Sequence, residues 1–299
     1  MYSNCPFCGS DKLEAVCHTD RIDKCLNCGH AFRQEIKPNI SEGYRGKVSM
    51  PLTLDAIVFA RHHYHFVEKH IAFENISSIL EIGSGDGVML DMISKRQPDI
   101  ELYSVEPSKY HCRNLRKIPN VNVFEGYIEQ AEFKRKFDLV VMSHVLEHIK
   151  IPHDIMKFIY DNLLETSGYL YIDIPNQDFE LSSELIASAA PAGHLFFFNG
   201  GSFGKLLENV GFSKTDIIGS KYSITTPGYL NRIEKIASLK DSTGPFNRFN
   251  IYRLKALNRL STMGYASYKF LAHNQPRELS LNHIDSRYNN MAIIARKSK

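Results

Sequence analysis

Four of the six cysteines form two matched pairs near the start of the chain. Cys5 and Cys8 make one C-x-x-C-G motif, and Cys25 and Cys28 make a second after sixteen intervening residues. Thiolates at this spacing can reach one tetrahedral ion, and two such pairs complete a closed site with no open coordination position. We therefore predict a structural Zn²⁺ site in a zinc ribbon over residues 1–37, a module too small to fold without its metal.

Two further residues between the pairs, Cys17 and His18, could replace a ligand, although a buried thiol and an ordinary histidine are the simpler interpretation. Short strands are expected around residues 13–16 and 30–32. Residues 1–49 carry seven basic and six acidic side chains, a balance that does not suit a surface for nucleic-acid phosphates. We expect the ribbon to serve as a lid or a docking element.

A glycine-rich turn is the second feature that could do chemistry. Gly83, Gly85 and Gly87 follow one another in a G-x-G-x-G pattern, which differs from the G-x-G-x-x-G pattern that binds a pyrophosphate. Glu81 precedes the turn and suits a cationic ligand, whereas Glu106, about twenty residues later, stands where ribose hydroxyls are held. Together they indicate a nucleoside that carries a positively charged amino-acid tail.

The elements around this turn must present it at a sheet edge. Residues 78–82 are an apolar run of strand length, and residues 88–95 have helical spacing. A second apolar strand at residues 102–105 ends on Glu106. In an open parallel sheet such a turn lies at the carboxyl end of a strand, where glycines let a ligand approach the backbone.

At this point the chain resembles the class I S-adenosylmethionine-dependent methyltransferases. The resemblance rests on four ordered blocks that run through residues 71–212: Glu81-Ile-Gly-Ser-Gly-Asp-Gly87, Glu106-Pro107, Phe137-Asp-Leu-Val-Val-Met-Ser-His-Val-Leu-Glu-His148 and Gly168-Tyr-Leu-Tyr-Ile-Asp-Ile-Pro-Asn176. It implies an α/β, Rossmann-like fold with a seven-stranded sheet. A linker and helix at residues 38–75 would join the ribbon to a methyltransferase domain at residues 76–299.

The resemblance also implies which residues meet the cofactor, S-adenosyl-L-methionine. They come from the glycine turn and from the ends of the next three strands: Glu81, Gly83, Ser84, Gly85, Gly87, Glu106, Pro107, Tyr127, Ile128 and Ser143. The family often has an acid where Tyr127 stands, to receive the adenine amino group. Its absence here leaves that contact to stacking or to the backbone.

Three histidines and one glutamate are the candidate catalytic residues. His144, at the carboxyl end of the fourth strand, and His194, on a later loop, are ranked equally as a base for a hydroxyl nucleophile. Glu147 and His148 are expected at the start of the next helix, and the family's Leu-Glu-His signature suggests a structural task for at least one of them. The helix at residues 53–73 holds four more histidines, one of which is a candidate for facing the substrate.

The remaining elements complete the expected sheet. We expect strands at residues 121–126, 137–142 and 169–174, the last preceded by a helix that ends near residue 165. A helix at residues 202–210 and two final strands at 212–218 and 290–295 follow. The seventy residues between those strands, about 220–288, are predicted to be an insertion that includes an amphipathic helix at 247–260.

Charge is distributed unevenly along the chain. Residues 213–299 hold 15 basic and 5 acidic side chains, whereas residues 1–212 hold 21 and 28. The basic insertion is either a solvated face or a site for an anion, such as a nucleotide-sugar diphosphate, an RNA backbone or an anionic membrane surface. No apolar stretch is long enough to span a membrane and no signal sequence is evident, so we expect a cytoplasmic protein.

The sequence therefore predicts an S-adenosylmethionine-dependent methyltransferase. The favoured partner is a small polar metabolite, with O-methylation of a sugar or nucleotide-linked sugar in glycan or secondary-metabolite biosynthesis as the expected reaction. This substrate class rests on family analogy and on the basic insertion. Two alternatives stay open: an RNA base methyltransferase, which the balanced charge of the ribbon disfavours, and a non-catalytic scaffold that binds S-adenosylmethionine.

Overall fold

The computed structural model describes residues 2–18, 21–34, 54–176, 193–213, 217–222 and 290–298. The chain divides into two units, residues 1–222 with 277–299, and residues 223–276. The second unit lies outside the described residues. So do the linker after the ribbon and nearly all of the predicted insertion, including its helix at residues 247–260.

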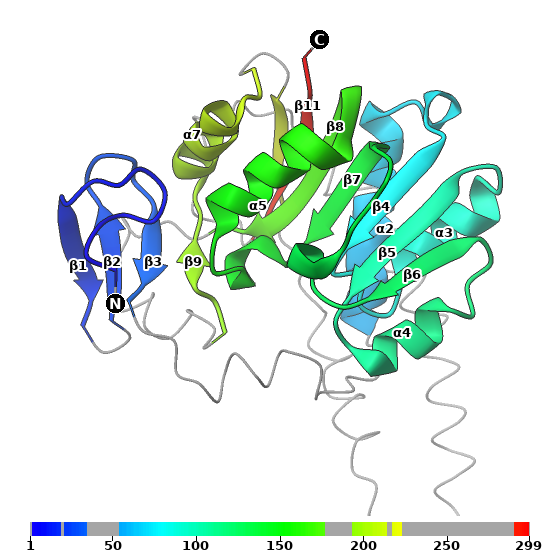
Figure 1. The fold of residues 1–299 in the computed structure, drawn as a ribbon, viewed down its shortest axis with the longest axis horizontal. Coiled ribbons are helices and arrows are strands. Elements are labelled where there is room, and N and C mark those ends of the chain that lie inside the picture. The colour runs from blue at the N-terminus through cyan, green and yellow to red at the C-terminus, as the bar shows by residue number, and fades with distance from the viewer. Residues whose placement is uncertain are drawn as a thin grey trace, which may run out of the picture. The chain divides into compact units, whose positions relative to one another are not determined.

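A seven-stranded sheet forms the centre of the first unit and confirms the predicted class I methyltransferase fold (Figure 1). Its strand order is β10-β11-β8-β7-β4-β5-β6. Strand β11 runs antiparallel to its neighbours β10 and β8, and the five strands from β8 to β6 are parallel to one another. The strands are β4 Ser78–Ile82, β5 Glu101–Glu106, β6 Val121–Glu125, β7 Phe137–Ser143, β8 Leu164–Pro175, β10 Ile217–Tyr222 and β11 Asn290–Arg296.

Helices cover both faces of this sheet (Figure 1). The α-helices are α2 Leu54–His70, α3 Val88–Arg96, α4 Lys109–Leu115, α5 Pro152–Phe158 and α7 Gly200–Val210. A π-helical turn, Ile159–Leu163, extends α5, and 3-10 helices lie at Phe73–Asn75, Ile128–Gln130 and Leu146–His148. Helices α5 and α7 share one apolar core with side chains of β4, β7 and β8. Helix α2 packs on the opposite face, where the rings of Phe66 and Tyr171 lie 5.9 Å apart.

The strand, turn and helix around the glycines form as the sequence predicts. All five residues of β4 are buried, which suits a central strand of a parallel sheet whose two faces are both covered. Gly87, with a φ of +70°, is the N-cap of α3. The turn therefore lies at the carboxyl end of β4, between β5 and β7 in the sheet.

Three predicted boundaries are wrong. The strand expected from residue 169 begins at Leu164, and Ser167, with a φ of +67°, lies at an irregularity in the pairing of β7 with β8. The strand expected from residue 212 begins at Ile217, and Phe212 is instead a buried residue directly after α7. The Leu-Glu-His segment forms the 3-10 helix Leu146–His148 rather than starting α5, which begins at Pro152, since proline is favoured in the first turn of a helix.

The ribbon is a second, smaller sheet, coloured blue in Figure 1. Strands β1 Leu13–Cys17, β2 Ile22–Cys25 and β3 Ala31–Arg33 pair antiparallel, and β3 pairs in turn with β9 Phe196–Phe197 from the methyltransferase domain. Phe32 and Phe196 are fully buried in the same core as the residues under α5 and α7. The ribbon is thus joined to the larger domain by both a backbone ladder and apolar packing.

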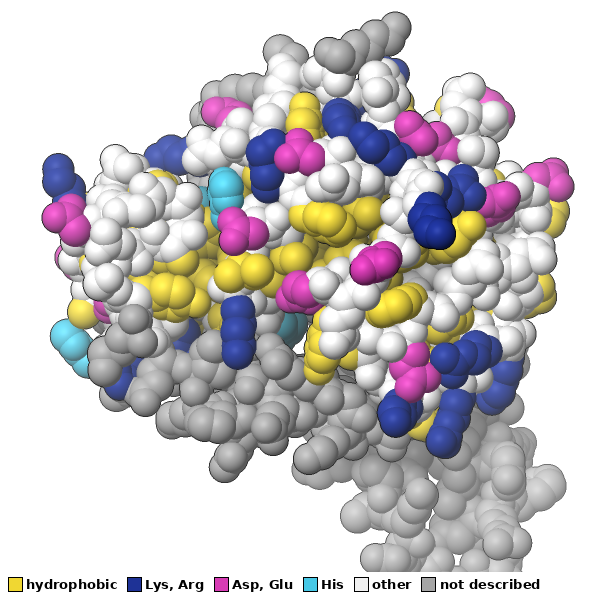
Figure 2. All heavy atoms as spheres, viewed as in Figure 1, with side chains coloured by type: hydrophobic (Ala, Val, Ile, Leu, Met, Phe, Trp, Pro, Cys, Tyr) yellow, Lys and Arg dark blue, Asp and Glu magenta, His cyan; other side chains and the backbone are white. Residues whose placement is uncertain are grey.

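Hydrophobic side chains reach the surface in a band across the middle of the face shown in Figure 2, with charged side chains around it. Ile151, which is 48% exposed, is one of the large apolar side chains on the described surface. No described helix is both long and apolar enough to cross a membrane.

Candidate active site

A pocket of about 690 Å³ opens at the carboxyl ends of β4, β5 and β7. It brings together two groups of predicted residues that are far apart in the sequence. From the cofactor group it is lined by Gly83, Glu106, Pro107, Tyr127 and Ile128, and from the catalytic group by His144, Glu147, His148 and His194.

The glycine turn forms one wall of the pocket and has no room for side chains at two positions. Gly83 has a φ of +73°, and a Cβ atom there would lie 2.3 Å from Cγ2 of Val145. At Gly87, with a φ of +70°, a Cβ atom would lie 2.5 Å from Leu115. Gly85 also has a positive φ, of +52°, but no atom lies within 4 Å of the equivalent position. Packing therefore requires glycine at positions 83 and 87, whereas position 85 has open space beside it.

Glu106 holds the turn in place and faces the pocket. One of its carboxylate oxygens accepts a hydrogen bond from the Gly85 N–H at 2.9 Å, and the other accepts from the Ser108 N–H at 2.8 Å. A carboxylate oxygen can accept more than one hydrogen bond. Glu106 can therefore keep these bonds and still receive the hydroxyls of a ribose.

Glu81 is buried on β4, the strand beside the one that ends on Glu106, and it does not line the pocket. Burial, with a smaller contribution from Glu106, raises the pKa of its carboxyl to about 8. Its Oε2 atom is enclosed and makes no hydrogen bond to any described residue. An enclosed carboxylate without a donor is costly, and the ammonium of an amino-acid tail would remove that cost. This observation fits the predicted cofactor.

Two predicted cofactor residues have structural contacts instead. The Ser84 hydroxyl donates to the Glu81 carbonyl at 3.0 Å and contacts the Ser104 hydroxyl at 2.8 Å, which ties the turn to β5. The Ser143 hydroxyl lies 3.3 Å from Nδ1 of His63 on α2. Neither serine lines the pocket.

Tyr127 and Ile128 form the wall beyond β6, as expected for an adenine site. The Tyr127 N–H donates to the Gln130 side chain at 3.0 Å, which fixes the 3-10 turn that follows. Glu129 also lines the pocket and was missed from the sequence. It is an acid two positions after Tyr127, so it can supply the acceptor whose absence at Tyr127 was noted above.

His144 is enclosed by two carboxylates. Its backbone has a φ of +52°, and its N–H donates to the Asp173 carbonyl at 2.8 Å. Its Nε2 lies 3.2 Å from the Asp173 carboxylate and its Nδ1 lies 3.5 Å from that of Glu147. Burial alone would lower the pKa of the imidazole, but the two carboxylates raise it to about 10. Both ring nitrogens are thus engaged, and the ring is held as a cation.

Asp173 is a functional candidate that the sequence analysis missed, and His63 is one of the four histidines of the helix at residues 53–73 among which it expected a substrate-facing residue. Asp173 is fully buried on β8, and its carboxylate lies between Nε2 of His63, at 3.4 Å, and the His144 ring. These histidines hold the pKa of Asp173 well below its usual range in spite of its burial. The only signal in the sequence was an acid inside an otherwise apolar strand.

A second polar cluster lies on the far wall of the pocket. The ligand atoms of Glu147, His148 and His194 all lie within 4.8 Å of one another. Nδ1 of His148 donates to the Gly193 carbonyl at 2.8 Å, because a carbonyl can only accept. The rings of His148 and His194 meet edge to face at 4.9 Å. Burial lowers the pKa of His194 to about 4, so its imidazole is neutral at neutral pH.

The family model for the methyltransferase domain matches residues 55–217, more than half of the 299 residues. This chain belongs to the methyltransferase-domain family. The predicted class, a class I S-adenosylmethionine-dependent methyltransferase, is thereby confirmed for the domain.

Two curated relatives resemble this chain over a little more than a third of its length. A Bacillus subtilis protein named "Putative methyltransferase YrhH" is 31% identical over 116 residues, which is 37% of this chain and 64% of the relative. The malonyl-(acyl-carrier protein) O-methyltransferase of Priestia megaterium is 24% identical over 111 residues, 36% of this chain and 40% of the relative. The matches thus span less than two thirds of either relative.

Solved structures share the fold of the methyltransferase at low identity. A possible histamine N-methyltransferase from Thermotoga maritima has a TM-score of 0.51 at 17% identity and covers 81% of this chain and 92% of its own. Coclaurine N-methyltransferase, bound to N-methylheliamine and SAH, has a TM-score of 0.52 at 14% identity, with 88% and 82% covered. At these identities the likeness shows the fold alone.

The ribbon of the methyltransferase brings its four paired cysteines together. Sγ of Cys5 lies 3.5 Å from that of Cys28, and Sγ of Cys8 lies 3.6 Å from that of Cys25. Four thiolates around one Zn²⁺ at about 2.3 Å would lie roughly 3.8 Å apart, so the cluster fits this ion closely. The predicted alternative ligand Cys17 packs instead in a separate apolar cluster with Ile22, Ala31 and Phe197.

The docked ribbon also contacts the loop that carries His194 and Leu195, two residues that line the pocket. The Arg33 N–H donates to the Leu195 carbonyl at 2.8 Å, and the Arg33 guanidinium donates to the His194 carbonyl at 3.1 Å. The ribbon therefore fixes the backbone of the loop that carries His194.

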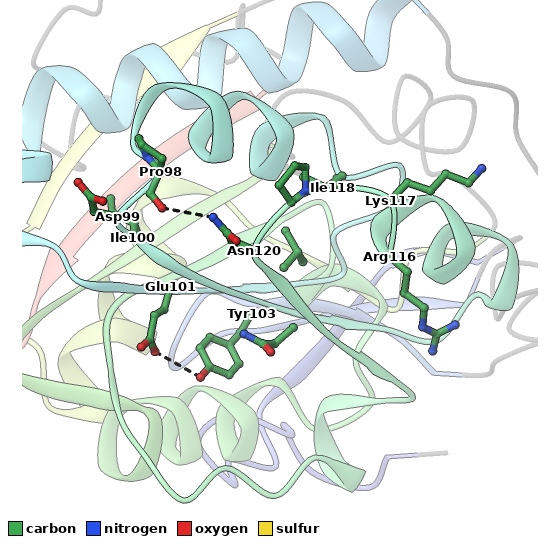
Figure 3. Close-up of a pocket in the computed structure, with 12 residues that line it drawn as sticks. Pro98, Asp99, Ile100, Glu101, Tyr103, Arg116, Lys117, Ile118 and Asn120 are labelled. Atoms are coloured by element: carbon green, nitrogen blue, oxygen red, sulfur yellow. Dashed lines mark hydrogen bonds between the residues drawn. The ribbon is translucent and has the colours of Figure 1, made fainter.

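A second hollow, of about 700 Å³, lies at the opposite end of the sheet (Figure 3). It is lined by the loops before β5 and β6, where Asn120 donates to the Pro98 carbonyl at 3.4 Å, and by the start of β5, where Tyr103 donates to Glu101 at 3.4 Å. It is open, and none of the predicted site residues lines it.

Proposed function

We propose that the protein transfers the methyl group of S-adenosylmethionine to a hydroxyl oxygen of a small polar metabolite. A sugar or a nucleotide-linked sugar is the first substrate class to test. The observation that supports this is the single pocket in which the predicted cofactor residues and a buried polar cluster face the same space. The relative that is a malonyl-(acyl-carrier protein) O-methyltransferase agrees with an oxygen acceptor.

The chain's own residues would hold the cofactor along one side of the pocket. Glu106 would receive the ribose hydroxyls, and Pro107, Tyr127 and Ile128 would enclose the adenine, with Glu129 as its hydrogen-bond acceptor. Glu81 would pair with the positively charged amino-acid tail. S-adenosylmethionine supplies an activated methyl group when bound, so the protein's remaining task is to align the acceptor and handle its proton.

The residues that would take the proton of the acceptor hydroxyl lie in the cluster on the far wall of the pocket. His144 lies between the carboxylates of Asp173 and Glu147, so neither of its nitrogens is available as a base while these contacts persist. His194, whose ring is neutral, lines the same pocket, and so does the buried carboxylate of Glu147. We therefore favour the cluster of Glu147, His148 and His194 as the group that activates the acceptor.

The lining of the pocket disfavours an anionic acceptor group. Glu106, Glu129 and Glu147 line it, whereas Lys150 is its only lysine or arginine among the described residues. An RNA backbone would be repelled by these carboxylates, which weakens the RNA alternative. The diphosphate of a nucleotide-linked sugar would have to lie outside the pocket, with the sugar inside.

We also propose that Cys5, Cys8, Cys25 and Cys28 hold one structural Zn²⁺. The four thiolates leave no position for substrate, so the ion would stabilise the ribbon rather than take part in the reaction. The fit of the sulfur atoms to a tetrahedral ion supports this proposal.

The test of the function is transfer of an isotopically labelled methyl group to a panel of free sugars, nucleotide-linked sugars, malonyl-(acyl-carrier protein) and RNA. We expect label in a sugar or nucleotide-linked sugar, as an ether that resists mild base. Label in RNA alone, or no transfer to any acceptor by protein that binds the cofactor, would contradict the proposal. In the latter case the scaffold alternative would stand.

A further inference from the structure

The cluster of Glu147, His148 and His194 on the far wall of the pocket contains the residue types that ligate metal ions. Two imidazoles and one carboxylate converge, with all three ligand atoms within 4.8 Å of one another. We propose that Glu147, His148 and His194 bind a divalent transition-metal cation. On the basis of the proposed function, this cation would coordinate the oxygen that receives the methyl group.

The set of donors matches a catalytic rather than a structural site. Three nitrogen and oxygen ligands leave one or more positions of the ion open, as in sites where a metal activates a water or a substrate oxygen. This differs from the ribbon, in which four thiolates close the coordination shell. Ligands of one ion at about 2.1 Å lie roughly 3 Å apart, so small side-chain rotations of these three residues would complete the site.

The cluster is already held by contacts typical of metal ligands. Nδ1 of His148 donates to the Gly193 carbonyl, which directs Nε2 toward Glu147, 4.0 Å away. A hydrogen bond of this kind sets the tautomer and the orientation of a coordinating histidine. The Leu195 N–H also donates to the Glu147 carbonyl at 2.8 Å. This bond ties the loop of His194 to the turn that carries the other two residues.

The carboxylate of Glu147 calls for a cation at this point. Its side chain is 1% exposed, and neither oxygen makes a hydrogen bond within the described part of the chain. Its contacts there are ion pairs, with His144 at 3.5 Å and with His148 at 4.0 Å. His144 also forms an ion pair with Asp173, whose carboxylate lies 3.2 Å from the other ring nitrogen, Nε2. A buried carboxylate in such surroundings is well suited to a metal ion.

The position of the cluster connects the ion with the reaction. Glu147, His148 and His194 line the same pocket as Gly83 and Glu106. An acceptor hydroxyl that coordinates the ion would lose its proton to solvent more readily, because a bound cation lowers the pKa of a coordinated oxygen. The oxygen lone pair then forms the new bond to the methyl carbon while the carbon–sulfur bond breaks. The products are a methyl ether and S-adenosylhomocysteine.

A direct test is metal binding by the full chain with its ribbon already loaded with zinc. Mn²⁺ and, separately, Co²⁺ are titrated by calorimetry in metal-free buffer, without any acceptor. We expect one ion per chain in addition to the zinc. Glu147→Gln and His194→Gln should weaken binding by at least about tenfold, while both variants still bind S-adenosylhomocysteine and retain zinc.

His153→Gln is the matched control, because His153 lies on α5 outside the pocket. It should leave metal affinity unchanged. The proposal is overturned if neither ion binds the folded, zinc-loaded protein, or if Glu147→Gln binds metal as tightly as the natural chain.

The experiments distinguish failure of the metal site from failure of the proposed function. Metal binding that depends on Glu147, without methylation of any hydroxyl, would support the site and reject the substrate proposal. Methylation at full rate in metal-free buffer, by protein that binds neither ion, would reject the site and support the substrate proposal.

Discussion

Glu81 is a carboxyl group buried near the carboxylate of Glu106, and this should make cofactor binding depend on pH. Its pKa of about 8 means that it is protonated in the empty protein at neutral pH. It must lose that proton to pair with an ammonium, which stays charged below about pH 7.5. We therefore expect the affinity for S-adenosylmethionine to rise with pH between about 5.5 and 7.0, by up to about tenfold per pH unit.

Calorimetric titrations at three pH values in this window check the prediction, and buffers with different ionisation enthalpies report the released proton. Glu81→Gln is the control, since the amide cannot ionise; its affinity should be weaker and its pH dependence smaller. An affinity of the natural chain that stays flat across the window would show that Glu81 does not ionise on binding.

Among individual residues, the sequence predicted those that belong to motifs of short, fixed spacing. The cysteine pairs, the glycines and Glu106 could be recognised because their motifs lie within a few residues of one another. The contact of His63 with Asp173 joins residues 110 positions apart. It exists only because α2 packs across β8, so no local pattern could predict it.

The turn after β4 offers a test of how tightly this element is built. Gly83→Ala would place a methyl group 2.3 Å from Val145 on a backbone with a φ of +73°. We expect it to lower the free energy of unfolding by about 1–3 kcal/mol and to weaken cofactor binding, as measured by denaturant titration and calorimetry.

Gly201→Ala is the matched control. Gly201 lies in α7, and a methyl group added there would have its nearest neighbouring atom 3.6 Å away. Alanine should be neutral there or stabilise the protein by up to about 1 kcal/mol. Equal effects of the two substitutions would contradict the account of the turn.

Loss of the ribbon's zinc should disturb the pocket, although the four cysteines do not line it. Cys25→Ser removes one thiolate of the predicted zinc site, and β3 carries the hydrogen bonds to the loop of His194. We expect the variant to lose its zinc and most of its methyl transfer, measured by metal analysis and by label transfer.

Cys17→Ser, which alters a buried cysteine outside the four-thiolate cluster, should keep one zinc per chain. Retention of zinc by Cys25→Ser, with loss in Cys17→Ser, would mean that the ligand set is misassigned.

Elements were predictable where a short segment determines its own structure. The apolar run of β4 and the glycines that end it require no distant partner, and β4 matches its predicted range. The start of β8 at Leu164 depends on its pairing with β7, including the irregularity near Ser167. Such a register is set by the neighbouring strand, which the local sequence does not specify.

For the molecule as a whole, the sequence indicated two modules but not how they join. The pairing of β3 with β9 brings together residues 31–33 and 196–197. Because β9 is only two residues long, it has no pattern that identifies it as a strand. This junction is nonetheless what relates the ribbon to the pocket, through Arg33 and the backbone of His194.

The central claim for the whole molecule is that the pocket binds S-adenosylmethionine through Glu106. The most direct measurement is calorimetric titration of S-adenosylmethionine and S-adenosylhomocysteine into the natural chain, Glu106→Gln and Glu101→Gln, with zinc assayed on each sample. Glu101 is the matched control, because it lies at the other end of β5 and is 58% exposed.

We predict one site of about micromolar affinity in the natural chain and in Glu101→Gln, and at least about tenfold weaker binding in Glu106→Gln, equivalent to about 1.4 kcal/mol. If the folded, zinc-loaded natural chain binds neither ligand, the assignment of the pocket is contradicted.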